Sequence, residues 1–108
     1  YNHIEKYVQK EIEVSCTQLK TFCKENNIDH VDLIWMDLQG AELIALESMG
    51  KELLSTVQVI HTELETTPIY KDQCLYPDVY QFLKNNGMYR AEGNSSLPFG
   101  QNFIFIRK

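Results

Sequence analysis

The stretch from Val31 to Gly50, VDLIWMDLQGAELIALESMG, constrains the fold more than any other part of the sequence. It opens with a nearly continuous apolar run, which is typical of a strand covered on both faces of a parallel sheet. After a short turn, Leu43, Leu46 and Met49 recur at helical spacing and predict a helix over residues 41–49 that Gly50 ends. The stretch therefore predicts a strand–turn–helix unit of an α/β protein.

Further patterns surround this unit on both sides. Helices are predicted over residues 16–26, where Ser15 and Gln18 form a capping box, and over 77–87, where Pro77 opens the helix. Strands are predicted over residues 10–14, 56–65, 88–93 and 101–108. The alternating elements predict parallel strands with right-handed crossovers, whereas the last two strands are too close for a helix and predict an antiparallel hairpin. The fold class is thus α/β, with a mostly parallel sheet and an antiparallel carboxyl-terminal hairpin.

Composition narrows the class of protein. A length of 108 residues predicts a single domain over 1–108. The net charge is −5 with ten scattered Lys and Arg residues, which is not the footprint of a nucleic-acid binder. No apolar run approaches the roughly 18 residues of a membrane span. Three cysteines without a C-x-x-C pair predict buried, inert thiols in a reducing compartment, the cytoplasm, and no metal site.

Candidate functional residues follow the ends of two predicted strands. Asp37 ends the first, and Glu63 and Glu65 end the next. Ligands of open α/β sheets lie outside the carboxyl ends of the strands, so these acids share one edge. Gln39 and Gly40 form the turn into the helix, whose first amide groups are expected to point into the same space. Two roles stay open for Asp37: it stabilises the start of the helix, or it faces a ligand, which we favour.

Several residues receive plainer interpretations. Gly40 is expected to supply a tight turn, and Glu42 is expected to face solvent in the first turn of the helix. His61, inside a strand, is expected to be a hydrogen-bonded core or supporting histidine. The aromatic side chains expected in the core are Trp35, Phe103 and Phe105. No glycine falls in a G-x-G pattern, so a phosphate loop is not predicted.

The same stretch resembles the strand–loop–helix signature of the FkbM-type methyltransferases. That signature is an Asp, an aliphatic residue, Glu or Gln, Gly, Ala and Glu after an apolar strand, and the matching residues are Asp37, Leu38, Gln39, Gly40, Ala41 and Glu42. Looser similarity runs over about residues 12–108, including VQVIHTELE, VYQFLKNNGMYRAEG and FGQNFIFIRK. Lys20 stands where the family usually has an acid.

The resemblance implies an S-adenosylmethionine-dependent O-methyltransferase with a Rossmann-like, seven-stranded sheet. The strands from 31–36 onward would be the fourth to seventh of that sheet. The resemblance assigns catalytic roles to Asp37 and Glu63, and cofactor contacts to Asp37, Leu38, Gln39 and Gly40. A small-molecule or sugar hydroxyl group is the expected methyl acceptor.

The glycine-rich cofactor loop of this family, which its members keep upstream, has no counterpart in the sequence. We therefore expect a carboxyl-terminal fragment that is inactive alone, and the alternative is a non-enzymatic α/β interaction module that reuses the half-fold. Strand 31–36 would then have an open edge, which predicts a homo-oligomer formed through that strand. The alternative is that residues 10–14 fold back over this edge; residues 1–11 are expected to be disordered or to form such a cover.

Overall fold

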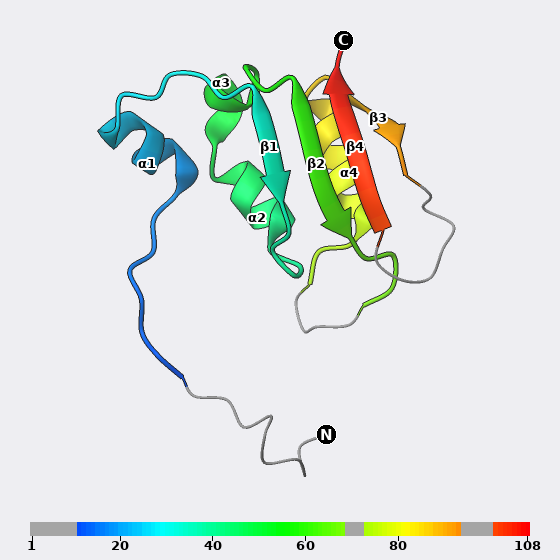
Figure 1. Cartoon of the computed structure of the whole chain (residues 1–108), viewed down its shortest axis with the longest axis horizontal. Helices are drawn as coiled ribbons and strands as arrows, with labels where there is room; N and C mark the ends of the chain where they lie inside the picture. The colour runs from blue at the N-terminus through cyan, green and yellow to red at the C-terminus, as the bar shows by residue number, and fades with distance from the viewer. Residues whose placement is uncertain (1–10, 69–72, 94–100) are drawn as a thin grey trace.

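The computed structural model describes residues 11–68, 73–93 and 101–108. Figure 1 shows its helices and strands, which alternate along most of the chain. They are α1 (Leu19–Glu25), β1 (Leu33–Met36), α2 (Glu42–Glu47), α3 (Gly50–Leu54), β2 (Val59–Leu64), α4 (Tyr76–Asn85), β3 (Met88–Glu92) and β4 (Gln101–Arg107). None of the helices in these ranges is long and apolar enough to cross a membrane.

The strands form one mixed sheet in the order β1-β2-β4-β3. The β1–β2 ladder is parallel, with Leu33 opposite Val59, and the predicted β3–β4 hairpin is antiparallel. The predicted α/β class is confirmed, but the sheet is mixed with only one parallel ladder, because β4 inserts between β2 and β3 and pairs antiparallel with both. β1, β2 and β3 still point in one direction, so β1 and β2 end at the same edge, as the prediction of the site requires.

Helices α2, α3 and α4 cover one face of the sheet (Figure 1). Phe103, Phe105, Val79 and Leu83 are fully buried there, as their spacing predicted. The opposite face is not covered by any described helix, and Leu33 and Trp35 on it are 57% and 74% exposed. The prediction of Trp35 as a core residue is therefore wrong: its position on β1 turns its side chain away from the helices.

The amino-terminal predictions are corrected in two places. Residues 11–18 are exposed and extended, so the described part of the predicted 10–14 strand neither forms nor covers the edge of β1 (Figure 1). Helix α1 begins at Leu19, and the predicted capping box does not form. Instead, the amide of Leu19 donates a hydrogen bond to Ser48 Oγ at 3.1 Å. Cys16 consequently lies outside the helix and is exposed, whereas Cys23 is buried and Cys74 is half-buried. Residues 1–10 and residues 94–100, which connect the last two strands, lie outside the described residues.

The predicted helix over residues 41–49 corresponds to α2, and a second short helix, α3, follows it where no helix was predicted. α2 ends at Glu47, and Gly50, expected to stop the helix, is the first residue of α3 with a φ of 75°. A left-handed residue redirects the chain without a steric penalty when it is glycine. The bend brings Leu53 and Leu54 of α3 into the same core as Leu46 of α2.

Candidate functional site

The turn after β1 has an unusual backbone. Asp37 directly follows the last residue of the strand, and the next residues include Gln39 with a φ of 54° and Gly40 with a φ of 103°. Glycine adopts such angles freely, but a residue with a β-carbon pays roughly 1 kcal/mol or more. The predicted turn role of Gly40 is confirmed, while the angle at Gln39 needs compensation from its surroundings.

Glu42 provides that compensation from the first turn of α2. Its side chain folds back over the turn: Oε2 accepts a hydrogen bond from Leu38 N at 2.7 Å, and Oε1 accepts one from Gly40 N at 3.0 Å. The residue is only 1% exposed. The prediction that Glu42 faces solvent is wrong, because amides that precede a helix lack intrahelical acceptors and this carboxylate satisfies them.

The structure shows how Asp37, for which the sequence left two roles open, is placed. Its Oδ1 accepts a hydrogen bond from Gln39 Nε2 at 3.0 Å, and its side chain is exposed. The start of α2 has no side-chain cap from its N-cap residue, and Glu42 holds the nearby amides instead. The Asp37 carboxylate is therefore exposed at the rim and is not used to cap the helix.

The amides that were expected to face a ligand are used inside the chain. Those of Leu38 and Gly40 donate to Glu42, and that of Ala41 donates to Leu38 O at 3.3 Å. Leu38 itself is 42% exposed. At this turn the exposed side chains are those of Asp37, Leu38 and Gln39.

A second loop packs against the turn, and no pattern in the sequence indicated it. Cys74 N donates to Gly40 O at 3.0 Å, and Cys74 Sγ lies 3.7 Å from Glu42 Oε1. Burial is the largest cause that raises the pKa of the Cys74 thiol. A β-carbon at Gly40 would lie 2.6 Å from Gln73 Cγ, so the loop leaves no room for a side chain there.

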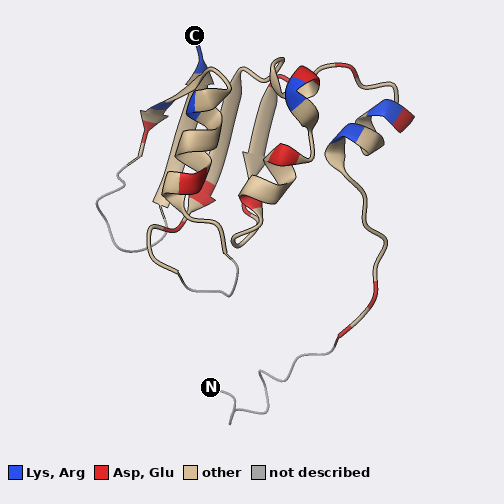
Figure 2. Ribbon diagram, turned by 180° about the vertical axis from the view of Figure 1, so that it is seen from behind, with Lys and Arg blue, Asp and Glu red and all other residues tan. Residues whose placement is uncertain are grey.

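The acids of the two strand ends converge as predicted. One small cleft is lined by Asp37, Gln39, Gly40, Glu42, Glu63, Glu65 and Gln73. Figure 2 shows acidic positions at this end of the sheet and the lysines of α1 and α3 at the other. The pKa of Glu63 is raised, first by loss of hydration and then by repulsion from Asp37, Glu65 and Glu42. In the described ranges, no group of three or more His, Cys, Asp or Glu side chains could hold a metal ion.

Two nearby polar atoms lack partners among the described residues: Glu65 Oε2 and His61 Nδ1 are enclosed without a hydrogen bond. Glu65 belongs to the acidic cleft. His61 lies four residues earlier, within β2, and its ring is tilted against that of Trp35, with ring centroids 4.4 Å apart. The expectation of a hydrogen-bonded core histidine is therefore not met at His61 Nδ1, whereas its supporting role stays a prediction.

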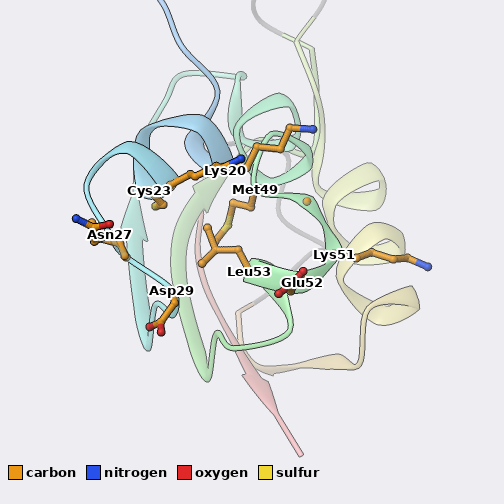
Figure 3. A pocket seen from close by; sticks show the side chains of 11 residues that line it. Lys20, Cys23, Asn27, Asp29, Met49, Lys51, Glu52 and Leu53 are labelled. Atoms are coloured by element: carbon orange, nitrogen blue, oxygen red, sulfur yellow. The ribbon is translucent and has the colours of Figure 1, made fainter.

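A larger cleft lies away from all predicted site residues. It has a volume of about 720 Å³ and runs between α1 and α3, where Lys20, Lys51, Met49 and Leu53 line it (Figure 3). This is the amino-terminal end of β1, whereas ligands of open α/β sheets bind outside the carboxyl ends. Chemistry and topology therefore favour the smaller acidic cleft as the candidate site.

Comparisons with known proteins agree with the motif. The family model of the methyltransferase FkbM domain matches residues 2–90. A curated relative, the 2-O-methyltransferase NoeI of Sinorhizobium fredii strain NGR234, is 36% identical over 76 residues, which are 67% of this chain and 31% of the relative. The chain thus spans about a third of the length of that relative. The search of solved structures gave no match.

Proposed function

Because this chain belongs to the FkbM methyltransferase family, we propose that it is the carboxyl-terminal part of an S-adenosylmethionine-dependent O-methyltransferase. The observation that carries the proposal is the exposed Asp37 carboxylate, which stands at the family motif and shares a cleft with Glu63. The curated relative is a 2-O-methyltransferase, which supports a hydroxyl group on a sugar or small molecule as acceptor. The family match favours this reading over the non-enzymatic binding module.

The proposed roles follow from the positions of the acids. Asp37 is exposed and accepts a hydrogen bond from Gln39, so it can orient an acceptor hydroxyl and receive its proton. Glu63 lines the same cleft, and its pKa is raised, first by loss of hydration and then by repulsion from the neighbouring acids; we assign it a contact with the same acceptor. Holding the acceptor oxygen in line with the methyl group supplies much of the rate in such a transfer.

The described residues do not by themselves fit the cofactor. The acidic cleft has a volume of about 10 Å³, whereas pockets for small ligands typically measure ~300–1,000 Å³. We propose that Asp37, Leu38, Gln39 and Gly40 form one wall of the cofactor site and that the rest comes from a preceding half of the protein. S-adenosylmethionine, when bound there, supplies the methyl group.

This proposal extends to the fold and to the edge of the sheet. The four strands are proposed to be the fourth to seventh of a Rossmann-like sheet, within a single domain. β1 is an edge strand with an exposed Leu33 and Trp35, and such an edge is a template for another chain. We propose that the isolated chain forms a homo-oligomer through β1. We also propose that the protein is cytoplasmic, which its three free cysteines support.

Methyl transfer by the longer protein that contains this chain tests the function. Asp37→Asn should lower kcat by about 100-fold or more, the usual range for a lost proton acceptor, and should change the Kd for S-adenosylmethionine much less. Glu47→Gln, an exposed acid on α2, is the matched control and should leave both unchanged. A loss of cofactor binding in proportion to activity, or no loss of either, would overturn the assignment of Asp37.

Calorimetry on the isolated chain tests the half-site. Because the described residues enclose almost no cofactor volume, no binding of S-adenosylmethionine is expected at micromolar concentrations. Micromolar affinity would show that this chain carries a complete cofactor site, and the proposal of a missing half would be wrong.

A further inference from the structure

Glu42 links three parts of the site that the sequence does not connect. Its two carboxylate oxygens accept the amides of Leu38 and Gly40, and Oε1 also lies 3.7 Å from Cys74 Sγ. The side chain is 1% exposed, so water does not compete for these bonds. No described Lys, Arg or His forms a salt bridge with it, so its described partners are the two backbone amides and the thiol of Cys74.

We propose that Glu42 is a positioning residue: it holds the backbone of residues 38–40 in its left-handed turn and thereby sets where the side chains of Asp37 and Gln39 stand. The consequence for catalysis rests on the proposed function, whereas the effect on the turn does not. The φ of 54° at Gln39 is costly for a residue with a β-carbon, and the short bond of 2.7 Å to the preceding amide offsets that cost.

A glutamate suits this position better than the similar side chains of glutamine and aspartate. Its two oxygens match two amide donors, whereas the single oxygen of glutamine accepts one and its NH₂ group faces the other donor. Aspartate is shorter by one methylene group and does not reach both amides from the same backbone. The hydrogen bond from Cys74 N to Gly40 O, at 3.0 Å, holds the loop over residues 73–75 against the turn that Glu42 orders.

Nuclear magnetic resonance on the chain itself tests the proposal in two ways. In the wild type, scalar couplings across the hydrogen bonds should join the amide nitrogens of Leu38 and Gly40 to the side-chain carboxyl carbon of Glu42. In Glu42→Gln, hydrogen exchange at one or both amides should accelerate by about tenfold, as expected when a charge-assisted bond is lost. The Gln39 side-chain NH₂ signals should also move, because that group donates to Asp37.

Two controls separate positioning from general destabilisation. Glu47→Gln removes the same charge from the exposed face of α2 and should change none of these signals. Leu83→Ala weakens the core under α4 and should lower global stability without moving the signals of residues 37–40. If the couplings are missing in the wild type, or if Leu83→Ala moves these signals as much as Glu42→Gln does, the positioning role is refuted. If Glu42→Gln does not fold, missing wild-type couplings still refute the proposal, and couplings at both amides support it.

An activity measurement distinguishes this inference from the proposed function. In the longer protein, Glu42→Gln should lower kcat more than it raises the KM for S-adenosylmethionine, because Asp37 is displaced while the remaining cofactor contacts persist. Altered signals with an unchanged kcat would refute the catalytic consequence. Altered signals in a wild-type protein that transfers no methyl group would refute the proposed function and leave the positioning of the turn intact.

Discussion

Replacing Gly40 by alanine probes the contact between the two loops of the candidate site. Gly40 has a φ of 103°, and an added β-carbon would lie 2.6 Å from Cγ, 3.1 Å from Cβ and 3.3 Å from Cα of Gln73. The first atom belongs to a flexible side chain and can move. The other two are close to the backbone, so the loop over residues 73–75 has to shift by a few tenths of an ångström.

The expected cost has two parts. A β-carbon in the left-handed region costs roughly 1–2 kcal/mol. The loop shift strains the bond from Cys74 N to Gly40 O, now 3.0 Å, and a bond of this kind is worth about 1 kcal/mol. Gly40→Ala should therefore lower the free energy of unfolding by about 2–3 kcal/mol, which corresponds to a fall in Tm of about 10 °C or more in a chain of this size.

Urea unfolding followed by far-ultraviolet circular dichroism measures this loss. Gly50→Ala is the matched control: Gly50 has a φ of 75°, but an added β-carbon meets only Lys20 Cδ at an ordinary 3.7 Å. It should therefore cost only the conformational part, about 1–2 kcal/mol. If the two variants lose the same free energy of unfolding, the loop does not press on Gly40 and the reasoning fails.

Three further predictions concern stability, charge and assembly. Arg107→Met should lower the free energy of unfolding by about 3 kcal/mol or more in urea titrations, because the guanidinium donates to the carbonyls of Leu54, Val57 and Asn86; a loss below about 1 kcal/mol would contradict this. Glu63→Gln should raise Tm at pH 7, because the pKa of Glu63 in the folded state lies above the ordinary 4.5. The wild type therefore loses stability as the pH rises from 4.5 through the folded-state pKa. In more acidic solution the higher Tm of the variant should disappear. An advantage that persists below pH 4.5 would point to packing instead. Sedimentation at micromolar concentration should show an oligomer, and a clean monomer with protected amides in β1 would exclude pairing through that edge.

Local patterns in the sequence were sufficient for most of the secondary structure and for the pairing of the acids. Helix α4 could be read from Pro77, Val79 and Leu83, and the hairpin from the short connection between its strands. Asp37 and Glu63 share a cleft because adjacent parallel strands must end at the same edge, whatever the rest of the fold does. Strand direction and residue order alone carry that information.

The order of the strands was harder to predict. The sequence indicated a hairpin but did not indicate that β4 would enter the sheet between β2 and β3. Both faces of β4 carry apolar residues, so its composition suits a central strand as well as an edge. The strands that β4 pairs with depend on all the pairings in the sheet together. Because β4 pairs with both β2 and β3, only the β1–β2 ladder is parallel.

The exposure of Trp35 and the burial of Glu42 were decided by tertiary structure alone. An aromatic residue in an apolar strand is buried only if a second layer covers its face, and the described residues place all the packed helices on the other one. A glutamate in the first turn of a helix normally faces water, but here the turn over residues 38–40 presents two amides within its reach. Gln73 and Cys74 join the site from more than thirty positions along the chain. These contacts depend on how the folded chain brings two loops together, and no local sequence pattern indicates which loops will meet.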